Sequence, residues 1–340
     1  TGEQMYLPVE FSIVEQLNKK FNQVTEDFKI INASKGGKST RGYVNDFVKW
    51  FPKVEKLKPE IVIFYTGLND STLKLPDHFD EQLAPIPALQ AVADATSTIR
   101  VGALVFDNDY KHPVVLAKEL ATIDVLSGGR LDIGLGAGWM ATDYERSGIP
   151  YDRPGVRIDR FLEGLDIIRS AMGEGAFSYE GEHYTISDYD GFPKPIQSPC
   201  PPVLIGGGGP RMLKIAAQQA DIVGINATLT SGAVDQSTFD SMTAEATDEK
   251  VDIVRVAAGD RLGHMEMNIR AFLVSVTEDV DAALEGIAAF TGSPTSVIAE
   301  SPFALVGPPS KLAEDLIARR ERWGFSYVIV GPDEAEAFAP

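Results

Sequence analysis

Near-continuous apolar runs alternate with amphipathic segments from about residue 28 to the end of the chain. Parallel strands covered by helices on both faces produce such runs, whereas strands with one wet face alternate apolar and polar residues. The runs that predict strands span residues 28–33, 60–65, 99–106, 130–138, 202–207, 220–226, 267–276 and 325–331. Strands that alternate with helices in this way predict an α/β fold, the (β/α)8 TIM barrel.

The segments between these runs carry the start and stop signals of helices. In residues 112–129, Pro113 suits a first helical turn, apolar positions recur at helical spacing, and Gly128 follows the end. Further helices are predicted over residues 11–21, 156–175 and 309–324. The main interruption is an insertion near residues 174–201, in which residues 177–186 predict a short hairpin.

A run of four glycines follows the predicted strand over 202–207 and is the strongest site signal in the chain. Gly206, Gly207, Gly208 and Gly209 let the backbone turn tightly and approach a ligand. The helix that begins after them offers free N–H groups and a partial positive charge, and Arg211 adds a cationic side chain. We expect a phosphate site here; the alternative is a plain strand-to-helix turn.

Small residues also end the predicted strand over 130–138. Gly136, Ala137 and Gly138 leave room for a flat ring system, against which Trp139 and Met140 could pack. The alternative is ordinary packing of a helix on a strand. Both interpretations place these residues at the C-terminal end of a barrel strand, where the chemistry of such barrels is found.

Polar side chains mark two further loops. Asp107, Asn108 and Asp109 either orient a substrate or cap the helix that follows them. His78, beside Asp77, either shuttles a proton and hydrogen-bonds a heteroaromatic ring, or is a surface histidine. No H-x-x-x-H or C-x-x-C spacing is present, so no metal site is expected.

Charge and cysteine content limit the partners. The 340 residues include 49 acidic and 31 basic side chains, a net charge of −18, which repels nucleic acid and anionic membranes. An anionic cofactor must therefore be held by backbone N–H groups or a few arginines. A single cysteine, Cys200, fits a reducing compartment, and we expect a cytoplasmic protein. No apolar run is long enough to span a membrane, and the start predicts no secretory signal.

Several segments from about residue 75 onward resemble the luciferase-like (LLM class) flavin- or deazaflavin-dependent oxidoreductases. They include DHFDEQLAP, IRVGALVFDNDYKHP, LDIGLGAGW and PVLIGGGGPRML. The LVFDNDYKHP form and the C-terminal segment are similar to the branch that uses coenzyme F-420. The resemblance implies a (β/α)8 barrel, hydride transfer between coenzyme F-420 and a small organic substrate, and a homodimer. The alternative within the class is an FMN-dependent monooxygenase.

The resemblance also implies roles for particular residues. The glycines 206–209 would bind the cofactor phosphate, and a bulge with a non-prolyl cis peptide at Leu104–Val105 would support the tricyclic ring. His78 matches the histidine that the family places near the ring. The glutamate that donates a proton in some F-420 members falls on Trp139, so this acid role has no evident occupant.

The first part of the chain resembles a different family. Residues 28–71 are similar to the middle of an SGNH (GDSL-type) hydrolase, in which Gly37 and Asn69 would help form an oxyanion hole. The Gly-Asp-Ser nucleophile block is absent, and Ser34, Ser39 and Ser71 are the only local serines. We expect residues 1–73 to replace the first β-α-β unit of a barrel completed by residues 74–340. An SGNH-type esterase and a chimeric barrel without catalysis are the alternatives from other classes.

Overall fold

The computed structural model describes residues 29–32, 61–64 and 84–330. Several of the sequence predictions lie outside these residues and stay predictions: the helix over 11–21, the role of His78, the oxyanion-hole pair Gly37 and Asn69, and the three serines. The described part of the segment 1–73 consists of the two short strands alone.

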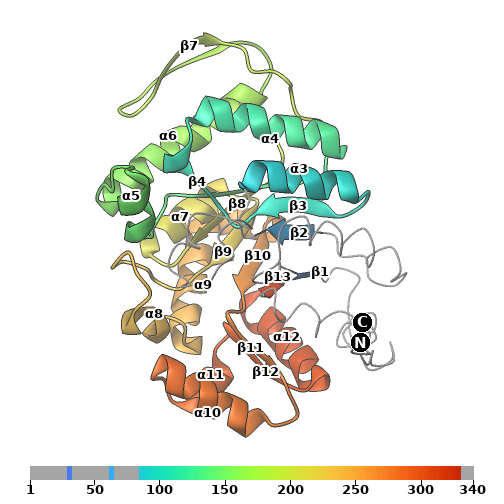
Figure 1. Ribbon diagram of the computed structural model, residues 1–340, viewed down its shortest axis with the longest axis vertical. Coiled ribbons are helices and arrows are strands. Elements are labelled where there is room, and N and C mark those ends of the chain that lie inside the picture. The colour runs from blue at the N-terminus through green and yellow to red at the C-terminus, as the bar shows by residue number, and fades with distance from the viewer. Residues whose placement is uncertain (1–28, 33–60, 65–83, 331–340) are drawn as a thin grey trace, which may run out of the picture.

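A ring of parallel strands forms the centre of the molecule (Figure 1). In hydrogen-bonded order the strands are β1 (Lys29–Asn32), β13 (Phe325–Val330), β10 (Glu266–Arg270), β9 (Ile222–Ile225), β8 (Val203–Gly207), β5 (Leu131–Gly136), β3 (Arg100–Ala103) and β2 (Ile61–Phe64). The first and last strands of this order, β1 and β2, lie beside each other and close the ring. The predicted barrel-type α/β fold is thereby confirmed.

The side chains of β5 and β8 alternate between the helices and the barrel interior. On β5, Ile133 and Leu135 belong to the large core shared with the helices, whereas Gly134 and Gly136 lie on the opposite face. Leu204 of β8 and Tyr327 of β13 form a second, smaller cluster with Leu104 and Val105 inside the ring. Each fully buried aliphatic or aromatic side chain contributes about 1.5–3 kcal/mol of hydrophobic stabilisation.

Helices cover the outside of the ring, and their ends follow local signals. α4 (Pro113–Ser127) and α12 (Pro309–Trp323) each begin on proline and end before a left-handed glycine, Gly128 and Gly324. The helices predicted over 112–129, 156–175 and 309–324 are confirmed. The other described helices are α3 (Pro85–Ala95), α5 (Ala141–Ser147), α6 (Pro154–Met172), α7 (Pro210–Gln219), α8 (Gln236–Asp240), α9 (Ala244–Ala258), α10 (Val280–Thr291) and α11 (Thr295–Glu300), with 3-10 turns η5 (Asn108–Tyr110) and η6 (Gly259–His264).

The predicted strand over 267–276 is wrong as a single element. β10 ends at Arg270, and β11 (Leu273–Val276) pairs instead with β12 (Ala304–Gly307) in a separate two-stranded sheet. The N–H of Ala271 still bonds to the last barrel strand, at Ile329 O, whereas that of Phe272 bonds to Phe303 O. Because the run over 267–276 contains no glycine or proline to mark a turn, the sequence does not indicate that the chain passes from one sheet to another here. The small sheet lies with α10 and α11 at the bottom of Figure 1.

The predicted hairpin is confirmed as β6 (Phe177–Glu180) and β7 (Thr185–Tyr189), which pair antiparallel and project at the top of Figure 1. Glu163 of α6 anchors its turn by accepting backbone N–H groups of Glu182, His183 and Tyr184. Within the described ranges, no helix has the length and apolar character needed to cross a bilayer.

Candidate functional site at the C-terminal ends of the strands

The bulge expected after β3 is present. The Leu104–Val105 peptide bond is cis, and the chain resumes as the short strand β4 (Phe106–Asp107), which pairs with β5. Two glycines of β5 make room for it. A Cβ on Gly134 would lie 1.9 Å from Ala103 O, and a Cβ on Gly136 would lie 2.7 Å from Val105 Cγ2. Gly136 therefore accommodates the bulge itself, and Gly134 is a residue that the sequence interpretation missed.

In the loop after β5, both the backbone conformation and the close contacts at position 138 require a glycine. Gly138 has a φ of 72°, and a Cβ there would lie 1.8 Å from the Tyr144 hydroxyl oxygen and 2.5 Å from Asp107 Oδ2. Ala137 packs on the main core, and the Trp139 carbonyl accepts a hydrogen bond of 2.8 Å from the Tyr151 hydroxyl. This loop is thus held against β4 and α5 beside the bulge.

Packing explains three of the four glycines at the end of β8 and directly after it. An added Cβ would lie 2.7 Å from Asn226 Nδ2 at Gly206, 2.6 Å from Met212 Cβ at Gly207, and 2.1 Å from the carbonyl oxygen of Ala227 at Gly208. At Gly209, by contrast, a Cβ would meet nothing within 4 Å. The space for a ligand therefore lies at Gly209, and the length of the glycine run by itself does not indicate a phosphate.

Gly209 is the N-cap of α7, and no side chain caps this helix. Pro210 fills the first helical position, so the N–H groups of Arg211 and Met212 are the first donors of the helix. Such an N-terminus attracts anions through its donors and its partial positive charge. Arg211 is exposed and reaches towards α6, where its guanidinium pairs with Asp159 and bonds to Gly155 O. A phosphate at this place would compete with Asp159 for Arg211.

The aspartates after β4 form a buried cluster rather than capping α4. Asp107 accepts the Asp109 N–H at 2.9 Å and so caps η5, whereas the cap of α4 is His112, which accepts the Val114 N–H. The alternative prediction, that residues 107–109 cap the helix that begins at Pro113, is therefore wrong. Asp109 pairs with Arg160 of α6 at 3.0 Å, and this carboxylate is 1% exposed. Asn108 is buried against α6 as well, where its side chain fills the space beside Gly164.

Tyr144 of α5, which is fully buried, joins the two carboxylates. Its hydroxyl lies 3.0 Å from Asp107 Oδ2 and 3.0 Å from Asp109 Oδ2. Burial raises the pKa of Asp107 to about 6, in part offset by the Asp109 N–H, and the neighbouring Asp109 charge raises it further. Arg157 of α6 lies over the Tyr151 ring, 4.2 Å from its centroid. The sequence interpretation missed Tyr144, Arg157 and Arg160, whose only signal was their position in the helices after this strand.

The structure thus brings most predicted site residues to one mouth of the barrel. Leu104, Val105, Asp107, Gly138 and Trp139 gather around the bulge. Residues 206–211 form the end of β8 and the start of α7, and β8 pairs directly with β5. The proposed contact of each with a cofactor stays a prediction.

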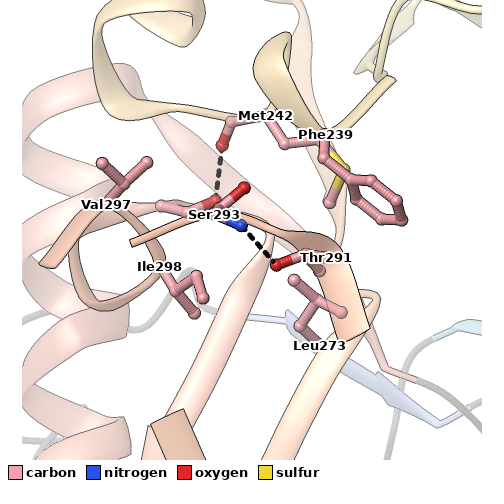
Figure 2. Close-up of a pocket in the computed structure, with 8 residues that line it drawn as sticks. Phe239, Met242, Leu273, Thr291, Ser293, Val297 and Ile298 are labelled. Carbon is pink, nitrogen blue, oxygen red and sulfur yellow. Dashed lines mark hydrogen bonds between the residues drawn. The ribbon is translucent and has the colours of Figure 1, made fainter. Parts of the chain in front are cut away.

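An apolar crevice elsewhere holds no comparable chemistry. It lies between the segment that follows β9 and the small sheet with its two helices (Figure 2). Its lining consists of Phe239, Met242, Leu273, Thr291, Ser293, Val297, Ile298 and Ser301. Two of its hydroxyls are already engaged, since Ser301 donates to Met242 O and Thr291 accepts from Ser293 N–H. Because none of these side chains titrates near neutral pH, the candidate site remains at the bulge and at α7.

Comparison with known proteins agrees with this geometry. A 5,10-methylenetetrahydromethanopterin reductase of Archaeoglobus fulgidus is 34% identical over 154 residues, which are 45% of this chain and 44% of that protein. An FMNH2-dependent dimethylsulfone monooxygenase of Pseudomonas putida is 26% identical over 203 residues, or 60% of this chain and 52% of that protein. The matches thus span about half the length of these relatives.

Among solved structures, the coenzyme F-420 dependent tetrahydromethanopterin reductase from Methanopyrus kandleri has a similar fold. Its TM-score is 0.68 at 21% identity, with 92% of this chain and 96% of that chain covered. The family model described as luciferase-like monooxygenase matches residues 30–324. This range includes most of the segment compared above with a hydrolase, and it lends that comparison no support. The chain therefore belongs to the luciferase-like monooxygenase family.

Proposed function

We propose that the protein is an oxidoreductase that transfers a hydride between coenzyme F-420 and a small organic substrate. One observation carries the proposal: the α7 N-terminus after Gly209 has no side-chain cap, has free space beside it, and lies at the barrel end that also holds the bulge. Similarity to an FMNH2-dependent monooxygenase makes FMN-dependent oxygenation the second candidate. Both cofactors carry a planar ring system and a phosphate.

The residues present fit such a cofactor. The backbone at Gly209–Met212, with Arg211 released from Asp159, would hold the phosphate against a chain of net charge −18. The Leu104–Val105 bulge and the loop at Ala137–Trp139 would support the ring. When bound, the cofactor supplies the hydride-transferring carbon, while the protein supplies binding, orientation and electrostatics.

Titration of the purified protein with coenzyme F-420 and with FMN, followed by fluorescence and calorimetry, tests this proposal. We expect saturable binding of one of them, and the tighter one distinguishes the two candidates. Failure of both to bind would overturn the proposal for both cofactors.

A matched pair of variants locates the phosphate. Gly209→Asp and Gly209→Asn both fit the open space at a φ of −93° and both cap α7, but the first alone adds a negative charge. Two like charges about 5 Å apart repel by about 1–3 kcal/mol at effective dielectric constants of 80 to 20. We therefore expect Gly209→Asp to weaken binding at least about fivefold relative to Gly209→Asn. If both variants bound the cofactor as tightly as wild type, the phosphate would bind elsewhere.

A further inference from the structure

Asp107, the last residue of β4, faces the same side as Val105, which directly precedes β4 and is one of the two residues of the bulge. Side chains two apart on a strand share a face, and the contacts agree: Val105 packs over Gly136 of β5, and Asp107 lies over Gly138, two residues further on. Val105 also belongs to the cluster inside the ring of strands. The Asp107 carboxyl therefore stands one step beyond the bulge, at the mouth of the barrel.

The Tyr144 hydroxyl contacts the carboxyl groups of both Asp107 and Asp109. If both carboxyl groups were ionised, the single hydrogen of this hydroxyl would have to serve two acceptors. The Tyr144 hydroxyl has a single hydrogen, yet its oxygen lies 3.0 Å from both Asp107 Oδ2 and Asp109 Oδ2. Asp109 is the better acceptor, because the guanidinium of Arg160 pairs with its other oxygen at 3.0 Å. When Tyr144 donates to Asp109, the contact with Asp107 is satisfied only if Asp107 carries a hydrogen.

The other groups near Asp107 indicate which oxygen holds that hydrogen. Oδ1 accepts the Asp109 N–H at 2.9 Å and lies 3.2 Å from the Tyr144 hydroxyl, whereas Oδ2 lies nearer to that hydroxyl, at 3.0 Å, and accepts no backbone N–H; Oδ2 is therefore the oxygen that donates to Tyr144. The remaining titratable or charged neighbours are Tyr110 on η5 and Arg157 on α6. Arg157 stacks on the rings of Tyr151 and Tyr144, and its attraction is the weakest of the influences on the Asp107 carboxyl.

We propose that Asp107 Oδ2 holds a proton and delivers it to the substrate beside the Leu104–Val105 bulge. This inference rests on the proposed function and fills the acid role left vacant at Trp139. In the step, a carbon of the substrate accepts the hydride from the reduced cofactor and its π bond to a neighbouring atom breaks. That atom keeps the electron pair and takes the proton from Asp107, which becomes a carboxylate. Water restores the proton after the product leaves.

The test begins without any cofactor. Carbon-13 NMR titration of the labelled aspartate carboxyls, with the Asp107 resonance assigned through Asp107→Asn, measures where this group ionises. We expect a midpoint near pH 6, since burial raises the pKa of Asp107 to about 6 from its ordinary 3.8. Asp94→Asn, on the exposed side of α3, is the matched control and should leave the midpoint unchanged. A midpoint near 4 would overturn the inference.

A second arm asks whether the carboxyl faces the cofactor. Repeating the titration with saturating coenzyme F-420, or FMN, should move the Asp107 midpoint upward by at least half a pH unit, because a ring over the bulge excludes water from it. An unmoved midpoint with bound cofactor would refute delivery at the bulge, while the proposed function would stand. If neither cofactor binds, the proposed function is refuted. Proton delivery to a substrate is then refuted too, at whatever pH Asp107 ionises in the cofactor-free protein.

Discussion

The substitution Asp107→Asn should remove a pH dependence of stability that the wild-type protein carries. The introduced asparagine would keep the cap, because its Oδ1 can accept the Asp109 N–H, and its amide can donate to Tyr144 as the protonated acid does. The pKa of Asp107 is higher in the folded protein, about 6, than its ordinary 3.8. The folded state therefore binds the proton more tightly, and ionisation of this group destabilises it.

The magnitude follows from the two values. Below pH 3.8 the group costs nothing, and above pH 6 its full cost is present. At 1.36 kcal/mol for each pH unit between them, the cost is about 3 kcal/mol. Between pH 4 and pH 7, the free energy of unfolding of wild type should thus fall by roughly 2–3 kcal/mol more than that of Asp107→Asn.

Urea unfolding followed by circular dichroism at pH 4, 5, 6 and 7 measures this difference. Comparing the two proteins at each pH cancels the titration of all other carboxylates, because both proteins share them. Parallel curves for the two proteins would refute the reasoning, since Asp107 would then ionise alike in the folded and unfolded chains. A variant less stable than wild type at pH 7 would likewise contradict it.

Three further predictions concern the loops of the site. Gly138→Ala should lower the free energy of unfolding by about 2–4 kcal/mol in chemical denaturation, because a φ of 72° and a Cβ 1.8 Å from the Tyr144 hydroxyl are both unfavourable. Gly208→Ala should lower Tm by several degrees, since its Cβ would lie 2.1 Å from Ala227 O, whereas Gly209→Ala, with open space, should leave Tm nearly unchanged; equal Tm values would contradict the packing account. Lys250, buried, donates to Asn226 O at 2.9 Å and Ser241 O at 2.7 Å, and burial lowers its pKa to about 8 from 10.5. The free energy of unfolding of wild type should therefore rise between pH 8 and pH 10.5 relative to that of Lys250→Met, which urea unfolding at these two pH values will measure. At pH 7 the variant should be about 2–4 kcal/mol less stable than wild type, because the two carbonyl groups lose their donor.

Much of the architecture could be predicted because its signals are local. Proline at a first helical position and glycine after the last turn mark α4 and α12 without reference to any other segment. Continuous apolar runs separate buried parallel strands from helices in the same way. The hairpin after α6 was predictable for the same reason, since its strands and turn lie within residues 177–189.

Local signals did not suffice where the partner of a segment decides its role. The run over 267–276 contains no glycine or proline, yet Leu273–Val276 leaves the barrel and pairs with β12, a strand that the sequence interpretation missed. The glycine run at the end of β8 predicted a phosphate site, and nothing in the sequence indicated that Gly206, Gly207 and Gly208 also pack closely against Asn226, Met212 and Ala227. Those contacts depend on strand order and register, which periodicity does not encode.

The sequence by itself determined the class of fold, the helix ends and the strand ends at which a site would form, because each depends on a few neighbouring residues. Only the tertiary structure decided which side chains meet there. Tyr144 reaches Asp107 across 37 positions and Arg160 reaches Asp109 across 51, because β4 pairs with β5 and α6 packs on η5. The contacts of the Tyr144 hydroxyl with both carboxyl groups exist only once those segments are packed. Burial, which no local pattern reveals, then determines the affinity of Asp107 for its proton.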